Sequence, residues 1–192
     1  MIVAEKISWD ERKALSEQLM NEAQPLTDEV FDRFGQGGGI YIISYTGKEL
    51  GGSIWQKDNP QIIYVAHNGL DSSRHWKNDT AISTVRRSLA AMLAISLNLN
   101  AIPKSADPED KDRFNNYRLN DESEEKLSQW MRDNLRLAFL PLSPADSEDY
   151  YLALIDYNTP MFNFQNNPRN DFGQQIKAYR RRLAEQAAMC EK

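Results

Sequence analysis

The sequence predicts an α+β domain built on a small three-stranded antiparallel sheet flanked by helices. Residues 39–46 (GIYIISYT) and 61–67 (QIIYVAH) are rich in β-branched and aromatic residues, and glycines mark turns in the connection between them. This pair indicates a β-hairpin with a long loop. Residues 135–140 (LRLAFL) predict the third strand. Segments with helical periodicity lie before, between and after the strands, which is the pattern of a mixed α+β domain.

The N-terminal region predicts a helix over residues 8–23. Ser8 and Glu11 form a capping box, and the apolar side chains that follow recur at helical spacing. We interpret residues 1–36 as a helical extension packed on the core. Residues 37–192 then form the main domain.

A glycine run at residues 35–39 (GQGGG) separates a short helix expected at 28–34 from the first strand. A glycine run can cradle a phosphate, but no Gly-Lys-Ser or Gly-Lys-Thr follows it and no helix begins after it. We therefore favour a flexible entry into the strand.

The middle of the chain predicts two further helices. Residues 82–97 carry apolar side chains on one face, and a charged surface loop is expected at 105–111. Asp121 and Glu124 are predicted to cap the second of these helices, which extends to Arg132 and turns its large apolar residues inward.

The C-terminal part predicts two helices separated by a turn. Ser143 followed by Pro144 is typical of a helix start, because serine caps free backbone N–H groups and proline fits the first helical position. A turn is expected at 166–168 (NNP), and a basic helix is expected at 174–191.

The composition is that of an ordinary globular domain. The chain has 192 residues, of which 41% are hydrophobic and 27% are charged. No apolar run approaches the roughly 18 residues that cross a bilayer, and the first residues do not resemble a signal peptide. The single cysteine, Cys190, excludes a disulfide or a cysteine-based zinc site within the chain. We expect a cytoplasmic protein without membrane association, and the oligomeric state stays open.

The charge distribution permits two interpretations. The net charge of −5 weighs against a protein that coats nucleic acid by charge alone. Basic residues nevertheless cluster on two predicted helices, at Arg86, Arg87, Lys177, Arg180 and Arg181. These clusters are either solvated helix faces or a nucleic-acid surface.

Several short motifs occur in an order that carries a family resemblance. Residues 39–41 (GIY) and 64–66 (YVA) stand on the two predicted hairpin strands. They are followed by STVRRSL at 83–89, NYRL at 116–119 and WM…NL at 130–135. In this order the motifs resemble the GIY-YIG nuclease superfamily, and they are most similar to an uncharacterised bacterial branch related to restriction-type nucleases.

The resemblance implies a set of site residues. Members of the family use a tyrosine pair on the hairpin, an arginine on the following helix, a glutamate that holds one divalent metal, and an asparagine after a proline-containing turn. The positions that match here are Tyr41, Tyr64, Arg74 and Asn163, and Tyr151 stands where the glutamate is expected.

The substitution at the glutamate position bears directly on activity. A phenol with a reference pKa near 10 is a poor ligand for a hard divalent cation compared with a carboxylate. Losing one charge-stabilising group costs about 3 kcal/mol or more of transition-state stabilisation. Glu148 precedes Tyr151 by three residues, so a displaced carboxylate is a candidate substitute on the same helix face.

The arginine position is the second departure from the family pattern. Arg74 lies in a segment that is shorter than in the related branch, and we take it as the best candidate. Arg86 or Arg87 could occupy part of the same space. A structural pairing of a buried arginine with a carboxylate is an equal alternative.

These features predict a GIY-YIG-fold protein with impaired catalysis that acts as a nucleic-acid- or protein-binding, regulatory module. No cofactor is expected in that case. The alternative is an active Mg²⁺-dependent DNA endonuclease of restriction type with a rearranged metal ligand. Acidity favours a protein partner, whereas the basic C-terminal helix favours DNA. A fold kept only for packing into a larger complex is a third possibility.

Overall fold

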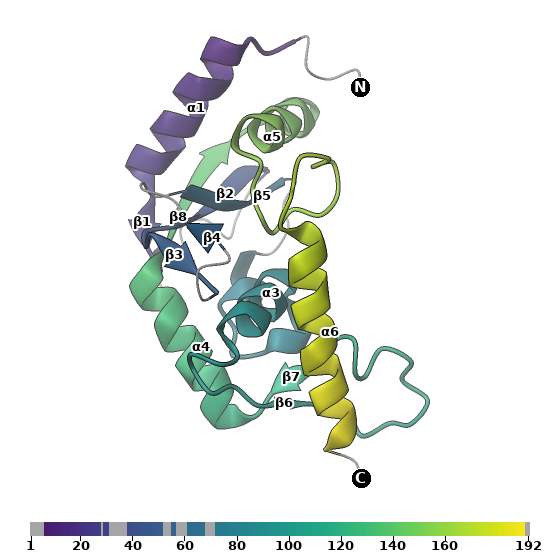
Figure 1. Cartoon of the computed structure of the whole chain (residues 1–192). Coiled ribbons are helices and arrows are strands. Elements are labelled where there is room, and N and C mark those ends of the chain that lie inside the picture. Colours follow the sequence, from purple (N-terminus) through teal and green to yellow (C-terminus); the bar gives the residue numbers. More distant parts are fainter. Residues whose placement is uncertain are drawn as a thin grey trace. The chain divides into compact units, whose positions relative to one another are not determined.

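The computed structural model describes residues 6–27, 29–30, 38–51, 55–56, 61–67 and 72–190. Its internal contacts divide the chain into two compact units (Figure 1). The first unit comprises Met1–Lys48, Lys57–Ser72 and Arg132–Asp171. The second unit comprises Glu49–Gln56, Ser73–Met131 and Phe172–Lys192. Three separate stretches of sequence therefore build each unit.

The first unit contains an antiparallel sheet of four strands in the order β1-β8-β2-β5. The three expected strands are confirmed as β2 (Gly39–Tyr45), β5 (Gln61–His67) and β8 (Leu135–Pro141). The expected number of three was wrong, because β1 (Gln24–Pro25) adds a two-residue strand beside β8. Two residues are too few to show an alternating pattern in the sequence.

Two helices pack on the sheet of the first unit. Helix α1 (Trp9–Glu22) begins with the expected capping box at Ser8, and helix α5 (Pro144–Asn158) begins with the expected cap at Ser143. Both contribute to one apolar cluster with the sheet, which contains Leu15, Leu19, Ile40, Ile42, Ile62, Val65, Ala138, Leu154 and Ile155. The expected helix at 28–34 and the boundary at 36/37 lie largely outside the described residues.

The second unit is mainly helical. Its elements are η2 (Thr80–Ile82), α3 (Thr84–Leu93), α6 (Gly173–Met189), and most of η1 (Ser72–His75) and of α4 (Asp121–Asn134). Two short antiparallel ladders complete it: β3 (Glu49–Leu50) with β4 (Trp55–Gln56), and β6 (Ala101–Ile102) with β7 (Arg118–Leu119). Helix α6 packs on α3 and β6.

Helix α3 ends differently from its prediction, at Leu93 rather than 97. The chain continues through a turn in which the N–H of Leu99 donates to the carbonyl of Ala94 and the N–H of Asn98 donates to that of Ile95. Asn98 has φ 50°, so this turn is a Schellman motif with asparagine in the left-handed position.

Helix α4 also differs at its start. The cap is Asn120, whose side-chain oxygen accepts a hydrogen bond from the N–H of Ser123. The expected cap by Asp121 and Glu124 was wrong, because Glu124 points into the interior, where it is 3% exposed. Among the described residues, no helix has the length and hydropathy needed to cross a membrane.

Candidate functional site

Tyr41 and Tyr64 lie side by side on one face of the β2–β5 hairpin. Tyr41 is opposite Ala66 and Ile43 is opposite Tyr64 in the antiparallel register, so both tyrosines project from the same face. Their ring centroids are 6.2 Å apart and the ring planes meet at 52°. Tyr41 is buried and Tyr64 is half-buried. The structure therefore brings the two candidate tyrosines together.

The backbone before Tyr41 requires a glycine. Gly39 has φ 155°, a region that other residues rarely adopt. A Cβ atom at this position would lie 2.2 Å from the carbonyl oxygen of Leu140 on β8. The glycine of the GIY tripeptide thus permits close pairing of β2 with β8.

Tyr151 lies on α5 and packs on the opposite face of the hairpin. Its ring stacks on His67 with 4.2 Å between centroids and 28° between planes. Side chains alternate between the faces of a strand. His67 and Val65 therefore face α5, whereas Tyr41 and Tyr64 face away from it. The three candidate tyrosines do not share one face.

The groups around Tyr151 do not suit the divalent cation that the resemblance implies. Burial raises the pKa of the Tyr151 phenol above its ordinary value of 10, while the side-chain amides of Asn163 and Asn166 act in the opposite direction. The phenol is therefore protonated at neutral pH and is a poor ligand for Mg²⁺. Glu148 lies on the same helix and is exposed. Across the described parts of the chain, no three His, Cys, Asp or Glu residues gather in one place.

Asn163 has a clear structural role beside the candidate site. Its side-chain oxygen accepts a hydrogen bond from the N–H of Val65 at 2.9 Å, and its amide nitrogen donates to the carbonyl of Val65 at 2.8 Å. The N–H of Phe162 donates to the carbonyl of Ile63 at 3.0 Å. These bonds fasten the segment after α5 to β5 and place Asn163 next to Tyr151.

Arg74 lies on the short helix η1 in the second unit, whereas the three tyrosines and Asn163 belong to the first. Its side chain is half-buried. Its participation in a site with Tyr41 stays a prediction.

Arg86 is completely buried and forms an ion pair. Its Nη2 atom lies 2.7 Å from Oε2 of Glu124 and also donates to Ser128 at 3.0 Å. Glu124 accepts further hydrogen bonds from the N–H groups of Thr80 (2.7 Å) and Leu119 (3.1 Å). For Arg86 the structure therefore shows the alternative, a structural ion pair. Its guanidinium is buried and cannot contact a phosphate at the surface.

Arg87 is also buried, and its guanidinium donates to backbone carbonyls at Thr80 and Ala81. Burial, and next the nearby positive charge of Arg180, lower the pKa of Arg87 to about 10. The hydroxyl of Tyr117 donates to the carbonyl of Arg87 at 2.9 Å. The Arg87 side chain therefore also stabilises the interior and is not exposed at the surface.

The basic side chains of α6 lie at the surface. Lys177 and Arg181 are exposed and Arg180 is half-buried. Together with Asn115 they line a depression of about 280 Å³. Burial lowers the pKa of Arg180. Of the predicted nucleic-acid-binding residues, these three are the ones with side chains that reach the surface.

The sequence did not indicate that Glu124 is the partner of Arg86. A signal was present, since Arg86 and Arg87 stand between Val85 and Leu89 in a helix that is apolar on most sides. A charged residue in such a helix needs a buried counter-charge. That partner lies 38 residues further along the chain, so a local sequence pattern cannot identify it.

A comparison with protein families agrees with the hairpin geometry. A family model described as the GIY-YIG catalytic domain matches residues 43–182, well over half of the chain. The match includes Tyr64, Arg74, Tyr151 and Asn163 and begins after Tyr41. No curated protein and no solved structure matches the chain. The chain therefore belongs to the GIY-YIG catalytic domain family.

Proposed function

We propose that this protein is a GIY-YIG member with impaired metal-dependent cleavage that acts as a binding or regulatory module. The observation that carries the proposal is that Tyr151, which the family resemblance aligns with the metal-binding glutamate, is a half-buried phenol stacked on His67. Assignment to the restriction-type branch and a cytoplasmic location are part of the same proposal.

The physical argument concerns the charge that develops during phosphodiester cleavage. A divalent cation supplies much of the stabilisation of that charge, and a hard cation needs oxygen ligands with negative charge. A protonated phenol offers none. The half-buried Tyr64 still presents a hydroxyl that can hydrogen-bond to a phosphate, which supports binding without cleavage.

We expect the protein to leave supercoiled plasmid intact in the presence of Mg²⁺ or Mn²⁺. We further expect Tyr151→Glu to create weak Mg²⁺ binding, because it returns a carboxylate to the family position. Titration calorimetry measures this gain. The matched control is Tyr150→Glu, which places the same charge on the neighbouring residue of α5, and we expect no Mg²⁺ binding from it.

The alternative is an active endonuclease that uses a displaced carboxylate. Its support is Glu148, which is exposed one helical turn before Tyr151. EDTA-sensitive nicking by the unmodified protein, abolished by Tyr41→Phe, would establish the alternative and overturn the proposal. Loss of that nicking in Glu148→Gln would then identify the ligand.

The second part of the proposal concerns the partner. The exposed basic side chains of α6 support nucleic acid, whereas the net charge of −5 supports a protein partner. We place DNA first because Lys177, Arg180 and Arg181 surround one depression and carry charge of a single sign.

We expect Lys177→Gln with Arg181→Gln to weaken DNA binding and to reduce the salt dependence of the binding constant. Each lost phosphate contact removes about 0.9 from the slope of log K against log salt, so the pair removes about 2. Fluorescence anisotropy with a labelled duplex measures both quantities. Lys111→Gln with Lys126→Gln removes equal charge elsewhere and should leave the slope nearly unchanged. A protein that binds no DNA at low salt would contradict this role and leave the protein-partner form of the proposal.

A further inference from the structure

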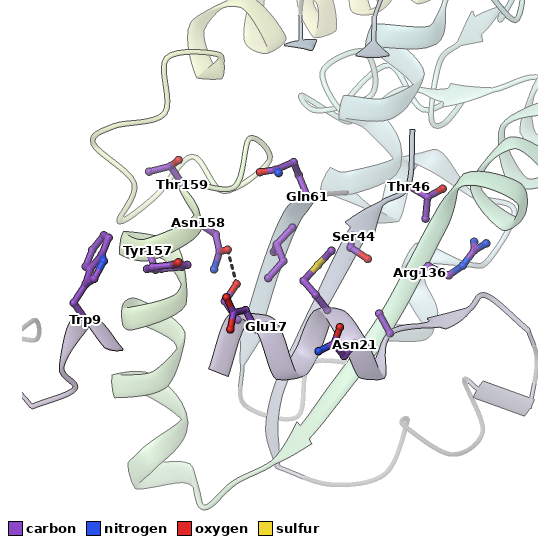
Figure 2. A pocket seen from close by; sticks show the side chains of 14 residues that line it. Trp9, Glu17, Asn21, Ser44, Thr46, Gln61, Arg136, Tyr157, Asn158 and Thr159 are labelled. Atoms are coloured by element: carbon purple, nitrogen blue, oxygen red, sulfur yellow. Dashed lines mark hydrogen bonds between the residues drawn. The ribbon is translucent and has the colours of Figure 1, made fainter. Parts of the chain in front are cut away.

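Two pockets, one in each unit, lie apart from the candidate site and from the basic depression on α6. In the first unit a polar pocket of about 940 Å³ extends along α1 from Trp9 to Ala23 (Figure 2). Its described lining includes both Glu17 and Arg136, so it favours neither an anion nor a cation. In the second unit a pocket of about 430 Å³ has a described lining that is uncharged except for Arg182. The smaller pocket therefore specifies the chemistry of its ligand more closely.

The smaller pocket has the size and the apolar walls of a small-molecule site. Its nine described lining residues all belong to the second unit, and they come from the end of α3, the turn after it, α6 and Gly51 beside β3. Ala91 and Met92 on α3 and Leu183 on α6 are buried, and the two helices pack on each other. Small-molecule sites have volumes of about 300–1,000 Å³ and combine apolar walls with a few polar groups.

The turn after α3 presents an isoleucine at the rim of this pocket. Ile95 lines the pocket and is 96% exposed. The turn is hydrogen-bonded, since the hydroxyl of Ser96 and the N–H of Leu97 both donate to the carbonyl of Leu93, at 3.2 and 2.9 Å. A ligand that covers Ile95 therefore removes apolar surface from water at a position that the backbone already holds.

Arg182 supplies the only charge among the described lining residues. Its side chain is exposed, and its guanidinium carbon lies 5.3 Å from the centroid of the Tyr179 ring. This cation–π contact orients the guanidinium above the ring. The planar guanidinium matches the two oxygens of a carboxylate. A single anionic group is therefore complementary to this rim.

Helix α6 presents this pocket and the basic depression through different residues. Tyr179, Arg182 and Leu183 are spaced by three and four positions, so they share one face of the helix. The basic depression is lined by another set of α6 residues, and the two linings have no described residue in common. A ligand in this pocket is therefore separate from the DNA of the proposed function.

We propose that this pocket binds a small monocarboxylic acid with an apolar body, such as a medium-chain fatty acid. The body would pack against Met92 and Leu183 and cover Ile95, and the carboxylate would pair with Arg182. Methionine suits this role because its flexible side chain adapts to the shape of an apolar ligand. A second negative charge would find no cation among the described lining residues. This inference goes beyond the proposed function and does not depend on it.

NMR titration of the ¹⁵N-labelled full chain with octanoate tests the proposal. We expect saturable shifts of the amide signals of Ala94, Ile95 and Leu183, and none at Asn163 in the first unit. Affinity should rise from hexanoate through octanoate to decanoate, about threefold for each added methylene. Octanol, which lacks the charge, and octanedioate, which carries a second charge at its apolar end, should each bind about tenfold more weakly than octanoate.

Two pairs of substitutions separate the charge from the apolar contact. Arg182→Gln should weaken octanoate binding about tenfold. Its matched control is Arg113→Gln, because Arg113 also lies over a ring, at 4.5 Å from the centroid of Phe114, but does not line the pocket. Ile95→Ser should weaken binding about fivefold, whereas Ile82→Ser, at a 46% exposed position outside the pocket lining, should not change it. Thermal unfolding verifies that each variant is folded.

Three results would overturn the proposal. The first is the absence of amide shifts at millimolar octanoate. The second is octanol binding as tightly as octanoate, which would remove any role for the charge. The third is octanoate binding that is unchanged by both Arg182→Gln and Ile95→Ser. None of these results bears on plasmid cleavage or on DNA binding by Lys177 and Arg181, so failure here is distinguishable from failure of the proposed function.

Discussion

Replacing Glu124 by glutamine is expected to lower the free energy of unfolding by about 3–5 kcal/mol. The substitution keeps the size of the side chain and an oxygen that can accept from Thr80. It removes the charge that compensates Arg86, which is 0% exposed. An uncompensated charge in the interior is far more costly than the ion pair is stabilising. Urea denaturation measures the change.

Glu122→Gln is the matched control for this substitution. Glu122 lies on the same helix and pairs with Lys126 at 2.7 Å, the same distance as in the buried pair, but its side chain is 75% exposed. We expect almost no change in the free energy of unfolding, because water screens exposed pairs. Adding Arg86→Met to Glu124→Gln removes both charges and should recover part of the lost stability. Equal effects of Glu124→Gln and Glu122→Gln would contradict the interpretation.

Replacing Asn163 by alanine is the second substitution with a large expected effect. It leaves both the N–H and the carbonyl of Val65 without their partners in a buried position, where Asn163 is 6% exposed. Each unsatisfied buried group costs about 1–3 kcal/mol, so we expect a total loss of about 2–6 kcal/mol. Hydrogen exchange should also show the N–H of Val65 losing protection.

Gln165→Ala, two residues further along the same segment, controls for a general effect of shortening a polar side chain there. Gln165 is exposed, and we expect its replacement to change the free energy of unfolding by less than about 0.5 kcal/mol. If Asn163→Ala were equally mild, the two bonds to Val65 would not be what fastens the segment to β5.

Local patterns predicted most of the elements that position the candidate site. The capping box at Ser8, the Ser143-Pro144 start of α5 and the β-rich segments at 39–46 and 61–67 each act within a few residues, so a window of sequence contains the whole signal. The register of the hairpin, which brings Tyr41 and Tyr64 together, was not among these predictions.

Features that depend on distant residues could not be predicted in the same way. The pairing of Arg86 with Glu124, the two-residue ladder of β6 with β7, and the bonds from Asn163 to Val65 join segments that are far apart in the sequence. The family resemblance named Asn163 and Tyr151 but carried no information about the ring stacked on Tyr151. The contact between Tyr151 and His67 depends on how α5 packs on β5, so a local sequence pattern could not predict it.

The segment after α5 also limits how this protein can associate with others. On one border of the sheet the N–H of Phe162 donates to the carbonyl of Ile63, and the side chain of Asn163 bonds both the N–H and the carbonyl of Val65. The other border is the two-residue β1, which ends in Pro25 and so offers no N–H there. A second chain could therefore continue the sheet at Ile63 and Val65 only by displacing the segment after α5.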